Sequence, residues 1–168
     1  MMSLRDISKS DERTYAIWQN NSELAGYLSR LYPYNSSVGD YGASRVCWFI
    51  IEEDACAIGS VWLEKVIEEP DSMILGIFLS GEQYRGKGIG RAAIQEAIRI
   101  SNQRIAFRNV RLNVRKSNLR AIKCYEKCGF KISGEGRKTA SDGTVISYYT
   151  MEKKVGGGTW DTYKKSAE

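Results

Sequence analysis

A glycine-rich turn joins a short apolar run to an amphipathic stretch near the middle of the chain. Gly86, Gly88 and Gly90 occupy alternate positions within residues 83–90. Residues 73–79 before the turn are apolar and have the length of a buried strand, and apolar residues recur at helical spacing after it. Glycines allow the main chain to approach a ligand closely, and free N–H groups at a helix start attract anions. The segment therefore predicts an anion-binding turn between a strand and a helix.

Basic side chains surround the same turn. Arg85, Lys87 and Arg91 add positive charge where the helix begins. A glycine-rich turn with a purely structural role is the competing interpretation, since such turns also occur without ligands. The charge and the strand–turn–helix context favour a phosphate ligand, most of all a pyrophosphate.

Three kinds of phosphate-binding turn can be compared with this segment. Residues 81–88 have the spacing of the P-loop of nucleotide hydrolases, but Gly88 stands where that loop needs Ser or Thr to hold magnesium. The dinucleotide-binding fingerprint needs a third glycine where Arg91 stands. The pattern of Gln83, Gly86 and Gly88 instead resembles the acyl-coenzyme A signature of the Gcn5-related N-acetyltransferases (GNAT).

A second block, residues 110–130, makes this resemblance more specific. Residues 110–114 read as a strand, and Asn118 follows in a turn before a short helix. The block ends on the pattern Tyr-Glu-x-x-Gly-Phe at residues 125–130, which is similar to the end of the family's cofactor-binding helix. Within the family, the block most resembles the ribosomal-protein Nα-acetyltransferases.

The resemblance implies an α/β fold of the α+β kind, with the order β-αα-βββ-α-β-α-ββ. It further implies a mixed, twisted sheet with helices on both faces and two parallel strands that splay apart at the cofactor cleft. We expect residues 1–155 to form a single domain, followed by a glycine-rich tail over residues 156–168. The expected strands cover residues 3–8, 45–53, 55–68, 73–79, 110–114, 131–139 and 144–154, and helices are expected between residues 10 and 28, from 89 onward and over 118–128.

The family's co-substrate, acetyl-coenzyme A, would lie between the strands at 73–79 and 110–114, with no metal. The end of the first strand would pair with the pantetheine arm, and the amides from Arg85 to Gly90 would hold the pyrophosphate. Asn118 would contact the arm or cap the following helix. The expected cofactor-binding residues are Phe78, Leu79, Gln83, Tyr84, Arg85, Gly86, Lys87, Gly88, Ile89, Gly90, Arg91, Asn118 and Tyr125.

The resemblance also implies a catalytic role for Tyr125, as the general acid that protonates the departing thiolate. A phenol is neutral at pH 7 and can donate a proton as negative charge develops; an aromatic core residue is the competing interpretation. A carboxylate base is harder to identify, because Ile74 and Asn113 stand where related enzymes often carry glutamate. The role of general base would then fall to Glu64 or to a chain of water molecules. The alternative is a protein that binds acetyl-coenzyme A as a regulatory ligand without catalysis.

The acceptor is expected to carry a primary amine, on a small molecule or a protein N-terminus. Polyamines, amino acids and aminoglycosides are all candidate acceptors. Aromatic residues of the first helices and the following loop are candidate lining residues, although core packing or loop anchoring is the favoured interpretation for any single one of them. They are Trp18, Tyr27, Tyr32 and Tyr34.

Composition argues against several other classes of function. The net charge of +5 suits an anionic cofactor, but the basic residues are scattered, so nucleic-acid binding is not expected. The four cysteines match no common zinc motif, and the chain contains no histidine. No signal peptide or membrane span is visible, which predicts a cytoplasmic protein. The family resemblance also allows a homodimer.

Overall fold

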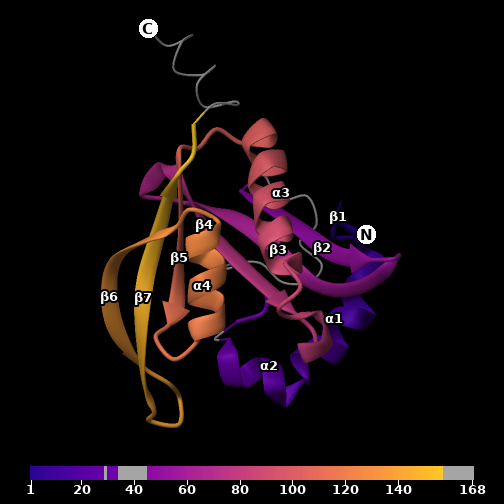
Figure 1. Cartoon of the computed structure of the whole chain (residues 1–168), viewed down its shortest axis with the longest axis horizontal. Coiled ribbons are helices and arrows are strands. Elements are labelled where there is room, and N and C mark those ends of the chain that lie inside the picture. Colours follow the sequence, from indigo (N-terminus) through magenta and orange to yellow (C-terminus); the bar gives the residue numbers. More distant parts are fainter. Residues whose placement is uncertain (29, 34–44, 157–168) are drawn as a thin grey trace, which may run out of the picture.

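Seven strands form one sheet in the computed structural model, which describes residues 1–28, 30–33 and 45–156 (Figure 1). The strand order is β1-β2-β3-β4-β5-β7-β6. The strands are β1 (Met2–Asp6), β2 (Val46–Glu53), β3 (Cys56–Val66), β4 (Glu69–Leu79), β5 (Asn109–Arg115), β6 (Lys131–Thr139) and β7 (Val145–Lys154). The α-helices are α1 (Glu12–Gln19), α2 (Ser22–Tyr27), α3 (Ile89–Arg104) and α4 (Leu119–Lys127), with short 3-10 turns at Lys9–Asp11 and Glu82–Tyr84.

Strand β2 shows how the sheet acquires a covered surface on each side. Successive strand residues point to opposite faces. Phe49 and Ile51 pack with α3 and α4 in one core cluster, whereas Trp48 and Ile50 pack with α1 and α2 in the other. All four side chains are buried. The expected mixed sheet with helices on both faces is therefore confirmed.

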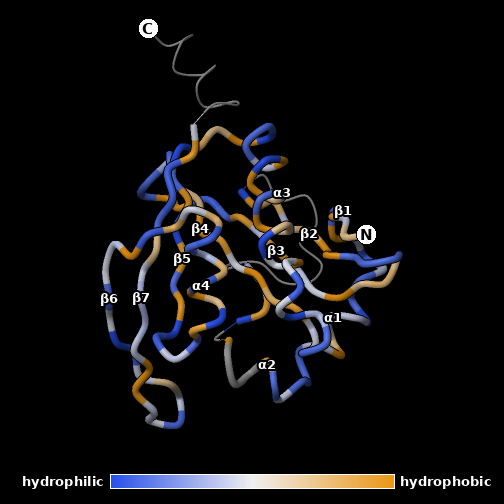
Figure 2. The backbone as a smooth tube through the Cα atoms, in the orientation of Figure 1, coloured by the Kyte–Doolittle hydropathy of each residue, from blue (hydrophilic) through white to orange (hydrophobic). Residues whose placement is uncertain are grey.

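Helix α3 is amphipathic, as its sequence predicts. Ala93, Ile94 and Ala97 are fully buried against the sheet, while Arg91 and Glu96 lie on the solvent side. Figure 2 shows the resulting alternation of hydrophobic and hydrophilic segments along the helix. Burial of this apolar face fixes the helix on the sheet, and with it the glycine turn that precedes the helix.

The central feature of the sheet is the short parallel pairing of β4 with β5. Only three pairs join the two strands, from Ser72 opposite Asn109 to Ile74 opposite Arg111. Beyond this point β4 stays paired with β3 as far as Leu79, and β5 stays paired with β7. The two strands therefore part over the second half of β4, as the family resemblance implies.

Strand β4 begins earlier than expected. The sequence predicts a turn at residues 68–71, but β4 starts at Glu69 and contains Pro70. The β3 register is irregular here, because Lys65 pairs with Met73 while Val66 pairs with Glu69. Pro70 lies within this irregularity, where no ladder partner on β3 needs its missing N–H group. The other expected strands and helices are present at close to their predicted bounds.

Two expectations fall outside the part of the chain that the structure describes. These are the loop that contains Tyr34 and all but the first residue of the tail 156–168. None of the described helices is long and apolar enough to cross a membrane.

A buried aromatic cluster anchors the segment after α2. Tyr15 is fully buried and contacts Trp18, Trp48 and Phe78 edge to face. Its hydroxyl donates a hydrogen bond to the carbonyl of Leu31 at 2.8 Å and accepts one from Trp48 Nε1 at 3.1 Å. The cluster thus ties the chain around Leu31 to β2 and β4.

We predict that Tyr15→Phe destabilises the protein by about 1–2 kcal/mol, because a buried hydrogen bond to Leu31 is lost while the ring is retained. Trp48 Nε1 keeps its second acceptor, Ser60 Oγ at 3.0 Å. The measurement is urea unfolding monitored by fluorescence. Tyr32→Phe is the matched control, since Tyr32 lies at the surface, and equal stability of the two variants would contradict the anchoring role.

Candidate functional site

A cavity of about 650 Å³ lies between the glycine turn, the end of β4 and helix α4. We call it the turn pocket. Ten of the residues predicted to bind the cofactor line it, which brings together two blocks that are distant in sequence. They are Phe78, Leu79, Tyr84, Arg85, Gly86, Gly88, Gly90, Arg91, Asn118 and Tyr125.

The glycine turn has the backbone geometry of an anion-binding site. Gly86 and Gly88 have φ angles of 74° and 80°, in the left-handed region where a side chain is strained. Gly88 caps the N-terminus of α3, and the amide of Ala92 makes a helical bond to the Gly88 carbonyl at 3.0 Å. The amides before Ala92, at the first turn of a helix, have no intrahelical acceptor and can bind an anion.

The Arg85 amide departs from the predicted arrangement. It donates a hydrogen bond to the Glu82 carbonyl at 3.0 Å and closes the short 3-10 turn. The Arg85 guanidinium contacts the carboxylates of Glu23 and Glu82, each at 3.3 Å. Arg85 therefore joins α2 to the turn, and the amides suited to an anion begin after it.

Three predicted cofactor-binding residues do not line the turn pocket. Gln83 is exposed, and its side chain lies against the backbone of Gly81. Lys87 is exposed on the turn. Ile89 is buried in the core, so only its amide faces the helix start. Their assignment stays a prediction.

Sequence reasoning missed a group of basic residues on α4. Arg120, Lys123 and Lys127 line the turn pocket opposite the glycine turn. Their spacing of three and four residues places them on one face of a helix, and that spacing is readable from the sequence. Together with Arg91 they give the pocket a positive rim that suits a ligand with several phosphates.

The end of β4 offers main-chain groups to the turn pocket. Leu79 and Phe78 pair with Gly59 and Ser60 of β3 on one edge of the strand. The other edge is paired with β5 only as far as Ile74. An extended ligand arm with amide groups can therefore continue the sheet pattern along residues 75–79.

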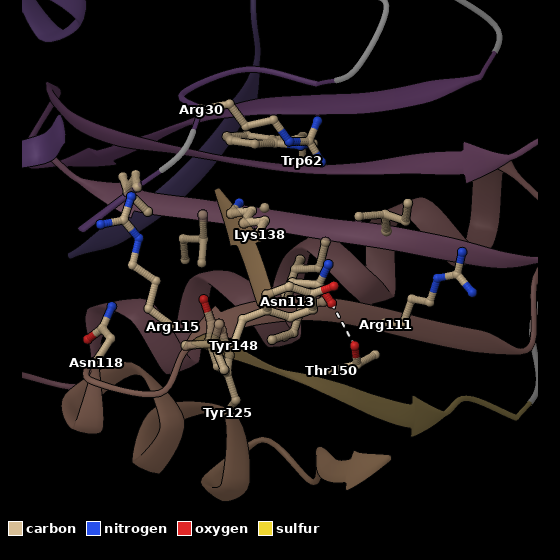
Figure 3. A pocket seen from close by; sticks show the side chains of 17 residues that line it. Arg30, Trp62, Arg111, Asn113, Arg115, Asn118, Tyr125, Lys138, Tyr148 and Thr150 are labelled. Atoms are coloured by element: carbon tan, nitrogen blue, oxygen red, sulfur yellow. Dashed lines mark hydrogen bonds between the residues drawn. The ribbon is translucent and has the colours of Figure 1, made fainter. Parts of the chain in front are cut away.

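A second cavity, of about 440 Å³, opens on the opposite side of the β4–β5 split (Figure 3). We call it the sheet pocket. Residues of β4, β5, β6 and β7 line it, and Trp62 of β3 covers it from above in Figure 3. The turn pocket and the sheet pocket share four lining residues, so they meet where the strands part. These are Leu28, Ile77, Asn118 and Tyr125.

Tyr125 lies at this junction on α4. Its ring is half-buried and packs edge to face on Phe130, with 6.0 Å between the ring centroids. Burial raises the pKa of the Tyr125 hydroxyl well above its ordinary value, and the neighbouring thiols of Cys124 and Cys128 add to the shift. The hydroxyl is therefore protonated at neutral pH. Asn118 lies about two helical turns before Tyr125, at the N-cap of α4, and its side chain accepts a hydrogen bond from the Ala121 amide at 3.3 Å.

The residues considered for a general base lie around the sheet pocket. Ile74 and Asn113 both line it, and neither carries a carboxylate. Glu64 pairs with Ile74 across β3 and β4, is buried, and accepts a hydrogen bond from Arg30 at 2.7 Å. The Glu64 carboxylate thus neutralises Arg30, which lines the pocket, and is not itself among the lining residues.

Two of the four aromatic candidates for the acceptor pocket can be located in the structure, and neither lines a cavity. Trp18 is buried in the core beside Phe78, with 5.3 Å between the ring centroids, and neither Trp18 nor Tyr32 lines either pocket. The side chain of Tyr27, like Tyr34, lies outside the described part. Trp62 is the aromatic residue that covers the sheet pocket. It fits because its register partner Gly76 has no side chain, and a Cβ there would lie 2.1 Å from the indole ring.

Comparison with known proteins identifies the family to which this arrangement belongs. Residues 3–130 match the acetyltransferase (GNAT) family. The chain belongs to this family. The match includes the glycine turn and both strands that part, and it ends at Phe130.

Several relatives that match part of the chain are named for the amines they acetylate. An aminoglycoside N(6')-acetyltransferase type 1 of Klebsiella pneumoniae is 32% identical over 94 residues, which are 55% of this chain and 44% of that protein. A spermine/spermidine N(1)-acetyltransferase of Bacillus subtilis is 27% identical over 77 residues, 46% and 43% of the two chains. An L-amino acid N-acetyltransferase of Escherichia coli is 31% identical over 72 residues, 42% and 44%. The matched segment thus spans less than half the length of each of these relatives.

Solved GNAT structures share the fold over most of the chain. A GNAT acetyltransferase of Streptococcus pneumoniae superposes with a TM-score of 0.75 at 20% identity, covering 93% of this chain and 100% of that one. Spermidine N-acetyltransferase of Vibrio cholerae, solved with CoA and spermine, also has a TM-score of 0.75, at 21% identity over 91% and 95% of the two chains. At this identity the likeness establishes the fold.

Among the described residues, no group of three or more acidic, cysteine or histidine side chains could hold a metal ion. The donors gathered in the turn pocket are amides and cations, which suit an anionic organic cofactor.

We predict that Gly88→Ala lowers the affinity for coenzyme A by about tenfold or more, because a side chain at this φ distorts the amides that face the anion. Gly143→Ala is the matched control. Gly143 has a φ of 86°, and neither glycine has an atom within 4 Å of an added Cβ, but Gly143 lies in the β6–β7 hairpin. Calorimetric titration with coenzyme A is the measurement. Equal affinities for the two variants would remove the turn from the binding site.

Proposed function

We propose that the protein is an N-acetyltransferase that moves the acetyl group of acetyl-coenzyme A to a primary amine. The observation that carries this proposal is the meeting of two cavities at the β4–β5 split. The turn pocket has the amides and cations to hold the phosphates of the cofactor. The sheet pocket offers a separate cavity for the acceptor, and Tyr125 lies where the sheet pocket meets the turn pocket.

The proposed reaction is a direct transfer. The neutral amine attacks the thioester carbonyl from the sheet pocket, a C–N bond forms, and the C–S bond then breaks. The nitrogen loses a proton to water, and the departing thiolate gains one from the Tyr125 hydroxyl, which regains a proton from solvent. Tyr125 suits this role because it lies at the junction and its raised pKa keeps the proton in place until negative charge develops on sulfur.

Removal of the proton from the acceptor amine needs no side-chain carboxylate in this proposal. Arg30, Arg111, Arg115 and Lys138 all line the sheet pocket. Nearby positive charges disfavour an ammonium ion and lower its pKa. The amine can thus lose its proton to water before it reaches the thioester, which is consistent with the side chains of Ile74 and Asn113.

The regulatory alternative requires a cofactor site alone. A protein that only senses acetyl-coenzyme A has no need for a second cavity that opens on the reacting end of the cofactor. The sheet pocket and the position of Tyr125 therefore favour the enzyme over the sensor.

The resemblance of residues 110–130 to ribosomal-protein Nα-acetyltransferases points to peptide N-termini as one acceptor class, whereas the relatives named above point to aminoglycosides, polyamines and amino acids. Thiol release from acetyl-coenzyme A against a panel of these amines tests the proposed function. Release with any of them supports the transferase. Tight cofactor binding without release from any would instead favour the regulatory alternative.

We further propose that residues 1–155 act as one domain and that the protein works in the cytoplasm. Sedimentation of the same preparation would test whether the protein forms a homodimer.

We predict that Tyr125→Phe lowers turnover by about 10²-fold and leaves the affinity for coenzyme A nearly unchanged, because the proton donor is lost and the ring is kept. Tyr149→Phe is the matched control, since Tyr149 packs on the core without lining either pocket. Steady-state thiol release and calorimetric titration are the two measurements. Undiminished turnover in Tyr125→Phe would exclude the residue as the general acid.

A further inference from the structure

Two cysteines at the end of α4 lie against the start of α3, beside the turn pocket. Cys124 is half-buried and lines this cavity, whereas Cys128 is buried in the core. The proposed acetyl transfer uses neither thiol. From their placement we infer that Cys124 is a modification site, which reacts with the disulfide of a small anionic thiol and, once modified, excludes coenzyme A. This inference goes beyond acetyl transfer and shares with it only the turn pocket as the cofactor site.

The Cys124 sulfur lies beside the glycine turn. A Cβ built on Gly90 would lie 3.6 Å from Cys124 Sγ. Gly90 belongs to the first turn of α3, whose amides have no intrahelical acceptor and can bind an anion. Because Cys124 also lines the turn pocket, a group as large as glutathione attached to its sulfur must extend into that cavity. The cofactor and such a group would therefore compete for the same space.

The second cysteine is close to the first, but the helix keeps the two from forming a disulfide with each other. The Cys128 amide donates the helical hydrogen bond to the Cys124 carbonyl at 3.1 Å, and Cys128 Sγ lies 4.0 Å from the Arg91 carbonyl oxygen. Cβ atoms four residues apart on a helix are about 5–6 Å apart, whereas a disulfide needs roughly 3.5–4.5 Å. Cys124 thus stays available to an external disulfide while α4 is intact.

Hydrogen bonding and nearby positive charge make Cys124 the more acidic thiol of the pair. A hydrogen bond from Cys128 lowers the pKa of the Cys124 thiol, although burial opposes the shift. The charges of Lys127 and Arg91 lower this pKa further. The hydrogen bond to Cys124 and burial raise the pKa of the Cys128 thiol, against the charges of Lys153 and Arg91. Since the thiolate is the nucleophile in exchange reactions, Cys124 is the sulfur that attacks.

The proposed modification is a thiol–disulfide exchange. The Cys124 thiol gives its proton to water, and the thiolate attacks one sulfur of the external disulfide. A new S–S bond forms while the old S–S bond breaks, and the released half leaves as a thiolate that takes a proton from solvent. The cysteine is oxidised and the released thiol is the reduced product. The positive rim of the turn pocket favours a disulfide whose halves carry carboxylates or phosphates.

The test treats the full-length protein with glutathione disulfide and locates the adducts by mass spectrometry of its peptides. We expect an adduct on Cys124, and saturating coenzyme A should slow its formation at least tenfold. Cys56 is the internal control, because it is exposed at the start of β3 and lines neither pocket. Coenzyme A should leave the rate of modification at Cys56 unchanged.

The affinity of the modified protein for coenzyme A provides the second arm. Calorimetric titration should show at least tenfold weaker binding after the treatment, and reduction with dithiothreitol should restore the affinity. Cys124→Ser should bind coenzyme A equally well before and after the treatment, because a hydroxyl does not exchange with a disulfide. Cys56→Ser is the matched variant, and it should lose affinity on treatment as the unsubstituted protein does.

The outcomes separate this inference from the proposed function. An adduct on Cys56 with none on Cys124, or an internal disulfide between Cys124 and Cys128, would overturn the inference and leave the transferase standing. Unchanged affinity of the modified protein for coenzyme A, or no protection of Cys124 by bound coenzyme A, would do the same. Failure of the untreated protein to bind coenzyme A would overturn the proposed function and this inference together.

Discussion

The parting of β4 and β5 is the constraint on which the rest of the molecule depends. Each strand is held by its other neighbour, β4 by β3 as far as Leu79 and β5 by β7 as far as Arg115. Because these outer ladders continue after the β4–β5 ladder stops at Ile74 and Arg111, the opening follows from the strand pairing of the sheet. Both pockets are consequences of it.

The two faces of the sheet place different groups around the opening between β4 and β5. Helices α3 and α4 cover one face; the anion-binding glycines lie at the start of α3, and the rim of basic residues runs along α4. On the other face, the aromatic cluster around Tyr15 packs on Phe78 and holds the chain near Leu31, next to Arg30. A hydrophobic core on each side thus positions charged groups at the same gap in the sheet.

Much of this arrangement could be predicted from local sequence. The apolar run before the glycine turn and the helical spacing after it predict β4, the turn and α3, because these patterns depend on neighbouring residues alone. Asn118 likewise predicts the start of α4, where it caps the helix. The mixed sheet and the parting strands came from the family resemblance, since no local pattern specifies which strands pair.

The rest depends on contacts between distant segments. The basic lining of the sheet pocket joins Arg30, Arg115 and Lys138, which nothing in the sequence brings together. The place of Trp18 could not be decided from sequence, because an aromatic residue on an amphipathic helix looks the same whether it faces a ligand or the core. Pro70 suggested a turn, and its place in β4 depends on an irregularity in the β3 register that only the folded sheet reveals.

Amide hydrogen exchange, with and without acetyl-coenzyme A, would test the central claim most directly. The cofactor should slow exchange at two separate places, the end of β4 over residues 75–79 and the helix start over residues 88–91. The first would report main-chain pairing in the gap between the strands, and the second would report the phosphate at the turn. Protection confined to other segments, at saturating cofactor, would contradict the claim that the parting strands form the binding site.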